Sequence, residues 1–531
     1  MTDVSGTKIA IVGAGPGGMV ALKEFRELGY NVTVFEKKED VGGVWMWSED
    51  TGATTALRET TLCNSKYSCA LPDFPFPKDF PWIVSAPELG AYYKDYAKHF
   101  DLYRNIQFNK VVTGLTRDEV AKKWNLFLSD EPSTPRPFDK VIWATGTFVR
   151  PKTASLPNAS AFAGPILHSS RARSLAPFAG QNVVVLGIGN TAADTANALI
   201  AHGAGRVYLS HRRGVKLMRP LDLKGVPSDF ALTTTLLPIT WWMQKHLPRT
   251  YGWIMDSAFA QNFRAAWGPS RPEWGLDGPS LEHGQHVVVC SMDLVPHIKS
   301  GRIHSVRGIK RIAGPRAVEF DDGSTAEDID AIIACTGYTD DLSMLDAAIS
   351  FTPAQEGVPR LPKLYMNTFP PEHSDSFAYV SLTHLLGPQI PGRALAALAL
   401  AKIWSAPSSS ASPLPSKQEM NRWIEKHQQW IRGRIAVAGP NANGYQEIDN
   451  GEWSYFMHGA AQTRLYEYIG WGRKAWALWW RDRELYSAVA GMPVCAWSYR
   501  QGCQQTNVLQ NFDLILFNFL NLNKQIFCAP D

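Results

Sequence analysis

The stretch Lys8-Ile9-Ala10-Ile11-Val12-Gly13-Ala14-Gly15-Pro16-Gly17-Gly18 decides the fold of this chain. It opens with an apolar run typical of a buried strand and continues as a glycine-rich turn. Residues 19–28 then have a helical composition, and Gly29 ends the predicted helix. A second strand is predicted at residues 31–35, directly before Glu36. Strand, glycine turn, helix, strand and acid in this order predict a parallel α/β unit that binds a dinucleotide.

Each residue type in this unit has a physical reason. Gly13 permits the tight turn, Gly15 lets the backbone approach a pyrophosphate, and Gly18 lets the helix pack closely on the strand. The free N–H groups at the helix N-terminus attract phosphate. Glu36 can accept hydrogen bonds from ribose hydroxyls, but its charge would repel a 2′-phosphate, so the site favours FAD or NAD over NADP. The predicted cofactor-binding residues are Gly13, Ala14, Gly15, Pro16, Gly17, Gly18 and Glu36.

The same pattern recurs near the middle of the chain. A strand is predicted at residues 182–186, followed by a second glycine turn and by a helix that continues to residue 201. The next strand, 206–210, is followed by His211-Arg212-Arg213 instead of an acid. Guanidinium groups pair with phosphate oxygens in bidentate geometry, so Arg212 and Arg213 are candidates for the 2′-phosphate of NADPH; solvated surface arginines are the alternative. The candidate residues of this second site are Gly187, Gly189, Asn190, Thr191, Asp194, Arg212 and Arg213.

Two nucleotide units with opposite charge preferences imply two cofactors, FAD and NADPH, with hydride passing from nicotinamide to flavin. The segments 138–146 and 329–338 share a further pattern, in which an Asp precedes an apolar strand that ends in Thr-Gly. Each follows one of the two units, so each is predicted to close one parallel sheet. Thr145 and Gly146 are therefore expected beside the first cofactor.

The fold class predicted is α/β, with two Rossmann-like dinucleotide-binding domains and the NADPH domain inserted into the FAD domain. Later helices are expected at residues 417–436 and 461–486, and strands of the FAD domain at 364–365 and 377–380. The predicted divisions are 1–174 (first part of the FAD domain), 175–335 (NADPH domain, with a Trp- and Pro-rich insertion at about 220–285), 336–490 (second part of the FAD domain and C-terminal helices) and 491–531 (a tail of unknown role).

Composition and charge exclude several classes of protein. The chain has 531 residues with a net charge of +4, which is far from the dense basic surface that a nucleic-acid partner would need. Its seven cysteines are scattered and form no C-x-x-C pair, which argues against a disulfide framework, a dithiol redox centre and a zinc site. No signal peptide is recognised in the first thirty residues, so a cytoplasmic protein is expected.

The segment 236–255 is apolar and aromatic, but Lys245, Arg249 and two prolines interrupt it, so it is not expected to span a membrane. It could lie peripherally in a membrane interface or roof the active site. A core or subunit contact rich in tryptophan is an equally good interpretation.

Three further motifs resemble those of one enzyme family. Val41-Gly42-Gly43-Val44-Trp45 follows Glu36, Thr61-Leu62-Cys63-Asn64-Ser65-Lys66 precedes Leu71-Pro72-Asp73-Phe74-Pro75, and Phe162-Ala163-Gly164-Pro165-Ile166-Leu167-His168 lies between the two nucleotide units. Together with the two glycine turns they resemble the flavin-containing monooxygenases, which have Baeyer-Villiger enzymes as relatives. The resemblance is continuous from about residue 8 to about residue 340. The family signature continues after His168 to an aromatic residue, where this chain has Ala172.

The resemblance implies an enzyme that uses FAD, NADPH and O2 to oxygenate nitrogen or sulfur of a small molecule through a 4a-hydroperoxyflavin. It implies that Gly43, Val44 and Trp45 extend the FAD site. It also places Asn64 and Ser65 at the flavin and nicotinamide, with Asn64 as the catalytic residue that stabilises the reactive intermediate. The alternatives are Baeyer-Villiger oxygenation of a ketone, or a cofactor-binding interaction protein without turnover. The sequence does not identify the substrate.

Overall fold

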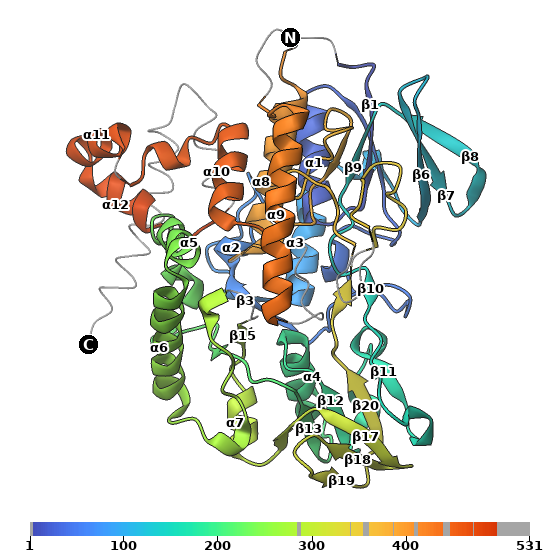
Figure 1. The fold of residues 1–531 in the computed structure, drawn as a ribbon, viewed down its shortest axis with the longest axis vertical. Coiled ribbons are helices and arrows are strands. Elements are labelled where there is room, and N and C mark those ends of the chain that lie inside the picture. Colours follow the sequence, from blue (N-terminus) through green and yellow to red (C-terminus); the bar gives the residue numbers. More distant parts are fainter. Residues whose placement is uncertain are drawn as a thin grey trace.

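Two parallel sheets of five strands form the centres of the two parts of the molecule in the computed structural model (Figure 1). The glycine turns and their helices lie in different parts, the first in the upper and the second in the lower half of this view. Of the tail predicted at 491–531, only residues 491–495 are among those described. The structure describes residues 4–283, 288–339, 341–353, 360–385, 387–407, 413–438, 446–470 and 472–495.

The first sheet is built around β1 (Lys8–Val12), which pairs in parallel with β2 (Asn31–Phe35) and β9 (Lys140–Trp143). Its outer strands are β5 (Ile106–Gln107) and β22 (Phe377–Tyr379). Ile9 and Ile11 face a core shared with α1 and α8, whereas Ala10 and Val12 face the β6–β7–β8 meander. Burial on both faces explains why β1 is continuously apolar after its exposed first residue, Lys8. The covering elements are α1 (Pro16–Glu27), α8 (Gln389–Trp404), β6 (Val112–Asp118), β7 (Lys123–Leu128) and β8 (Glu131–Phe138).

The second sheet has the strand order β11-β20-β12-β13-β16, and all its pairs are parallel. Its helices α4 and α7 pack on one face, and the small β17–β18–β19 sheet packs on the other. These elements are β11 (Ile166–His168), β12 (Val183–Leu186), α4 (Asn190–Ala201), β13 (Val207–Ser210), α7 (Leu294–Lys299), β16 (Ile303–Val306), β17 (Ile309–Gly314), β18 (Ala317–Phe320), β19 (Thr325–Ala326) and β20 (Ala331–Ala334).

All strands of the second sheet lie in sequence between β9 and β22 of the first sheet. The predicted nested α/β fold class is therefore confirmed. The second sheet takes its first strand, β11, from residues that precede the predicted boundary at 174/175. The two connections between the sheets run antiparallel as β10 (Arg150–Pro151) and β21 (Tyr338–Thr339). Remaining elements near the junction are β3 (Thr61–Ser65), α2 (Lys66–Cys69), β4 (Ile83–Ser85), α3 (Ala86–His99), β14 (Leu217–Met218) and β15 (Val289–Cys290).

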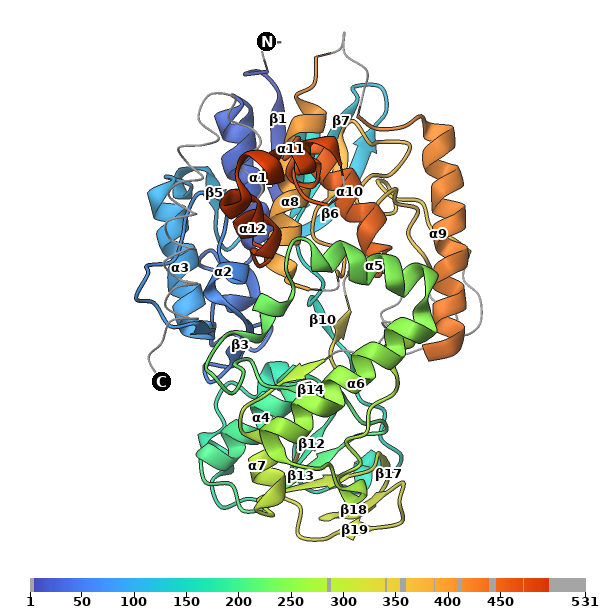
Figure 2. The ribbon, with the colours of Figure 1, turned by 90° about the vertical axis from the view of Figure 1, so that its left-hand side faces the viewer.

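The insertion forms two consecutive helices, α5 (Leu236–His246) and α6 (Pro248–Trp267), that run beside both halves of the molecule (Figure 2). α5 contacts α10 (Asn450–Ala460), and α6 contacts β14 of the lower half. Trp253 and Trp242 are 72% and 56% exposed on these helices. Within the described ranges no helix is both long and apolar enough to cross a membrane.

The C-terminal helices depart in part from the sequence prediction. α9 (Lys417–Ala438) confirms the helix expected at 417–436. The helical prediction for 461–486 is confirmed only from Arg473 onward: a short 3-10 turn is followed by α11 (Arg473–Arg481) and α12 (Arg483–Gly491). The break occurs because Asp482 has extended backbone angles and its carboxylate caps α12 by accepting the Leu485 N–H at 2.9 Å.

The strand predicted at Leu364–Tyr365 is also wrong, because Tyr365 forms only an isolated bridge with Phe369. Between them Met366 and Asn367 both have positive φ, which makes this segment a tight turn. The segment predicted at 377–380 does form β22, over Phe377–Tyr379.

Candidate cofactor and active site

The first glycine turn is held closed by backbone contacts that leave no room for side chains. Gly13 has a φ of 102°, and a Cβ at Gly18 would lie 2.0 Å from the Gly13 carbonyl oxygen. α1 begins at Pro16, so its unpaired N–H groups point outward from the end of β1. This geometry supplies the close, donor-rich backbone that a pyrophosphate requires.

Glu36 is 5% exposed and its carboxylate lies against this turn. Oε2 accepts the Ala14 N–H at 2.7 Å, and Oε1 accepts the Lys38 N–H at 2.9 Å. Each oxygen keeps a second lone pair for a ribose hydroxyl. The negative charge beside the turn fits FAD, which has no 2′-phosphate.

A second loop, residues 42–45, packs on the first turn. A Cβ at Gly43 would lie 3.2 Å from the Cα of Gly15, and the Gly42 N–H donates to the Ala14 carbonyl at 3.0 Å. Val44 and Trp45 are half-buried in a 3-10 turn that starts at Gly43. The loop therefore borders the predicted FAD site.

Lys38, which the sequence interpretation missed, fixes this loop. Its buried ammonium donates to the carbonyls of Gly43, Met46 and Thr54 at 2.7, 2.8 and 2.7 Å. Burial lowers the pKa of Lys38 to about 8, although the nearby Glu36 opposes that shift. A lysine two residues after the acid was the available signal, but only the fold shows which carbonyls it binds.

Thr145 and Gly146 follow β9, as predicted, and form hydrogen bonds with Tyr379 of β22 and with Ser381 just after it. The hydroxyl of Tyr379 donates to the Gly146 carbonyl at 3.1 Å and lies 3.3 Å from the Thr145 hydroxyl. The Gly146 N–H donates to the Ser381 hydroxyl at 2.9 Å. The end of β9 is thus fixed next to the first turn, where a Cβ at Gly13 would lie 2.8 Å from the Ala144 carbonyl oxygen.

The second glycine turn repeats the geometry of the first. Gly187 has a φ of 126°, and a Cβ there would lie 2.6 Å from the Cys335 carbonyl oxygen. Gly189 precedes α4 and a Cβ there would meet nothing within 4 Å, which leaves its backbone open. Thr191 is exposed, whereas the Asn190 side chain accepts the Cys290 N–H at 2.9 Å and so fixes β15.

Asp194 lies on α4, and the Thr60 hydroxyl donates to its Oδ2 at 3.0 Å. Burial raises the pKa of this carboxyl to about 7, against the lowering effect of that hydrogen bond. Glu59, the residue before Thr60, lies 2.9 Å from His202 at the end of α4. In the structure Asp194 therefore joins the two domains.

Arg212 and Arg213 follow β13 and are both exposed, whereas His211 is buried. Neither guanidinium forms an ion pair with a carboxylate of the described residues. Two guanidiniums without carboxylate partners at this sheet edge fit the 2′-phosphate of NADPH.

Asn64 and Ser65 end β3 at the junction between the two domains, near β15 and α4 (Figure 1). Asn64 is half-buried, and Ser65 is fully buried. Ser65 donates its N–H and its hydroxyl to Oδ2 of Asp229, both at 2.9 Å. Asp229 belongs to the insertion, and no sequence pattern pointed to it.

Near Ala172, the linker residue His168 contacts an aromatic ring that another part of the chain supplies. Ala172 is 4% exposed and packs in the core of the second sheet. The ring of Tyr338 lies edge-on against His168, with centroids 5.0 Å apart. Nε2 of His168 is 3.0 Å from the Gly337 carbonyl oxygen. The two interdomain connections are therefore held together without an aromatic residue at position 172.

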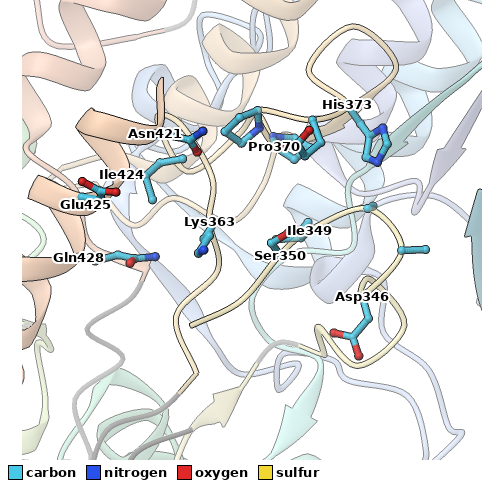
Figure 3. A pocket seen from close by; sticks show the side chains of 14 residues that line it. Asp346, Ile349, Ser350, Lys363, Pro370, His373, Asn421, Ile424, Glu425 and Gln428 are labelled. Carbon is cyan, nitrogen blue, oxygen red and sulfur yellow. The ribbon is translucent and has the colours of Figure 1, made fainter. Parts of the chain in front are cut away.

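A polar cavity of about 340 Å³ lies away from these residues, between the 346–350 loop, the 370–373 loop and α9 (Figure 3). Its lining includes Lys363, His373 and Gln428, and none of the predicted site residues. The candidate active site is instead the junction formed by the two glycine turns, β3 and the insertion.

Comparison with known proteins agrees with this geometry. The family model described as flavin-binding monooxygenase-like matches residues 6–499. Monooxygenase aurF of Gibberella zeae is 33% identical over 491 residues, which cover 90% of each chain. Dimethylaniline monooxygenase (N-oxide-forming) 2 of Oryctolagus cuniculus is 30% identical over 442 residues, covering 81% of this chain and 78% of that protein.

Solved structures share the fold at lower identity. S-allyl-L-cysteine S-oxygenase of Allium sativum has a TM-score of 0.60 and 18% identity, with 98% of both chains covered. Cyclohexanone monooxygenase of Rhodococcus sp. Phi1, bound to NADP+, has a TM-score of 0.61 and 15% identity, covering 87% of this chain and 98% of that one. By its family match the chain belongs to the flavin-binding monooxygenase-like family and is a flavin-dependent monooxygenase.

Proposed function

We propose that this protein is an FAD- and NADPH-dependent monooxygenase that transfers one oxygen atom of O2 to nitrogen or sulfur of a small molecule. The observation that carries this assignment is the opposite charge at the two glycine turns. Glu36 lies at the first turn, and the exposed Arg212 and Arg213 follow the strand next to the second. The N-oxide-forming relative supports the choice of nitrogen, and the Allium S-oxygenase fold supports sulfur.

The bound cofactors would supply the redox chemistry, NADPH giving hydride and FAD activating O2. The chain itself binds and orients them. Backbone N–H groups of the turn at Gly13–Gly18 would donate to the pyrophosphate, and Glu36 would accept hydrogen bonds from the ribose hydroxyls. Arg212 and Arg213 would hold the 2′-phosphate, which would select NADPH over NADH.

Asn64 has the catalytic role in this proposal. Its amide supplies both a donor and an acceptor at the end of β3, where the two domains meet. A fixed amide there can hydrogen-bond the reacting atoms and take the place of water, whose entry would divert oxygen to peroxide. The buried Ser65–Asp229 contact holds this end of β3 in place.

The replacement Asn64→Ala tests the proposal. We expect the variant to retain FAD and to be bleached by NADPH without air, but to give less sulfoxide from thioanisole and more hydrogen peroxide per NADPH. The matched control is Asn262→Ala, an exposed position on α6 that should behave as the wild type. Wild-type sulfoxide yield without extra peroxide in Asn64→Ala would refute the role of this amide.

Baeyer-Villiger oxygenation is the second candidate, because the cyclohexanone monooxygenase structure superimposes with a TM-score of 0.61. Ala172 departs from the aromatic residue of the family signature and so does not separate the two candidates, whereas the N-oxide-forming relative favours the first. Supplying N,N-dimethylaniline, thioanisole and cyclohexanone separately and identifying the products distinguishes the two reactions.

A further inference from the structure

Asp229 is a buried carboxylate that the insertion places against the candidate active site. It lies in a 3-10 turn, Ser228–Ala231, and is 7% exposed. Its Oδ2 accepts both the N–H and the hydroxyl of Ser65 at 2.9 Å. Ser65 directly follows Asn64, so this carboxylate positions the end of β3.

The other oxygen of the same carboxylate has no donor. Oδ1 of Asp229 is buried without a hydrogen-bond partner among the described residues. A buried charged oxygen that has lost its water and gained no donor is unfavourable, and such atoms are uncommon in folded proteins. Oδ2 alone holds the end of β3, so the Ser65 contact does not explain why a second, unpartnered carboxylate oxygen is buried here.

No cation neutralises this group within the described part of the chain. Thiols lie close to it: burial is the largest cause of the raised pKa of Cys69, and the charge of Asp229 is the second. The pKa of Cys290 is also raised. The hydrogen bond with the Cys63 thiol is the largest cause, and the charge of Asp229 raises this pKa further. Asp229 therefore lies close to these thiols and to the N–H and hydroxyl of Ser65.

We propose that Oδ1 of Asp229 accepts a hydrogen bond from an N–H or O–H group of a ligand bound beside Asn64, so that the insertion contributes a ligand-binding residue. This inference rests on the proposed function. The donor has two possible sources: the carboxamide of the nicotinamide ring, or an amino or hydroxyl group of the oxygenation substrate. Both have the same chemistry, and the binding experiments below separate them.

The substitution Asp229→Asn tests the unpartnered oxygen alone. The Asn carbonyl can still accept both hydrogen bonds from Ser65, which places an NH2 donor where Oδ1 was. The NH2 group of the variant then faces the N–H or O–H group of the ligand, and two donors cannot form a hydrogen bond with each other. The matched control is Asp222→Asn, an exposed carboxylate of the same insertion. Thermal unfolding of both variants shows whether the Ser65 contact survives.

If the nicotinamide is the donor, Asp229→Asn weakens NADP+ binding roughly tenfold or more, as expected for a hydrogen bond to a charged group. Binding of 2′-phospho-ADP-ribose, which lacks the nicotinamide, stays unchanged. If the substrate is the donor, NADP+ binding is retained. The preference of the wild type for 4-(methylthio)phenol over thioanisole, read as a ratio of kcat/KM, is then lost.

The inference is overturned if Asp229→Asn, folded and loaded with FAD, matches the control in both measurements. Failure of the proposed function would look different: the wild type itself would then show no bleaching of its flavin by NADPH, or no oxygenated product. An equal loss of affinity for NADP+ and for 2′-phospho-ADP-ribose would also overturn the inference. The second compound lacks the nicotinamide, so its weaker binding would indicate a general disturbance of the domain.

Discussion

The close approach of Gly18 to Gly13 makes Gly18→Ala a severe perturbation. The new Cβ would lie 2.0 Å from the Gly13 carbonyl oxygen, whereas Cβ atoms keep at least 3.0 Å from such atoms, so the backbone must separate by at least 1 Å. Overpacking of this kind costs about 1–3 kcal/mol. A 1 Å displacement also stretches a hydrogen bond of roughly 2.9 Å beyond useful length.

The consequence is a loss of FAD affinity. If two N–H donors to the pyrophosphate are displaced, at about 1.5–3 kcal/mol for each bond to a charged group, the dissociation constant rises at least ~100-fold. We expect Gly18→Ala to be purified with little flavin, measured as the ratio of flavin to protein absorbance. Calorimetric titration of the apoprotein with FAD gives the dissociation constant.

Gly17→Ala is the matched control, one residue away. Its Cβ would lie 3.7 Å from Cβ of Arg393 and 3.8 Å from Cγ2 of Val380, which are ordinary contacts. Alanine in this helix is favoured over glycine by about 1 kcal/mol, so this variant should keep its FAD. An equal FAD affinity in the two variants would refute the steric argument.

Three further substitutions test other parts of the site. Arg212→Ala should raise the KM for NADPH roughly tenfold while leaving that for NADH unchanged, because only NADPH carries the 2′-phosphate; equal changes in steady-state assays would contradict this. Lys38→Met should lower the free energy of unfolding by about 3 kcal/mol, since three buried carbonyls lose their donor; urea denaturation with a wild-type midpoint would exclude the role. For Asp194 the folded pKa of about 7 lies above the ordinary aspartate value of 3.8, so its contribution to stability is full below about pH 4 and is lost as pH rises through 7. Asp194→Asn should therefore remove up to about 4 kcal/mol of pH dependence, seen as a smaller difference between unfolding free energies at pH 4 and pH 8 than in the wild type.

Much of the fold could be predicted from local patterns. The two glycine turns, the strands beside them and the Asp-strand-Thr-Gly segments are each set by a few adjacent residues, and the sheets contain them as expected. The C-terminal region was harder, because residues 461–486 have a helical composition throughout, although the helices begin only at Arg473. The break there depends on Asp482, whose capping role is visible only from its backbone angles.

The sequence by itself determined the nested α/β fold, the position of the two turns and the opposite charges beside them, because these depend on residues close together in the chain. Only the tertiary structure decided what surrounds the candidate active site. Asp229 meets Ser65 across 164 residues, and Asp194 meets Thr60 across 134. Contacts at such separations are set by how the two domains and the insertion pack. No local periodicity records them, so the carboxylate that holds the end of β3 could be found only in the folded chain.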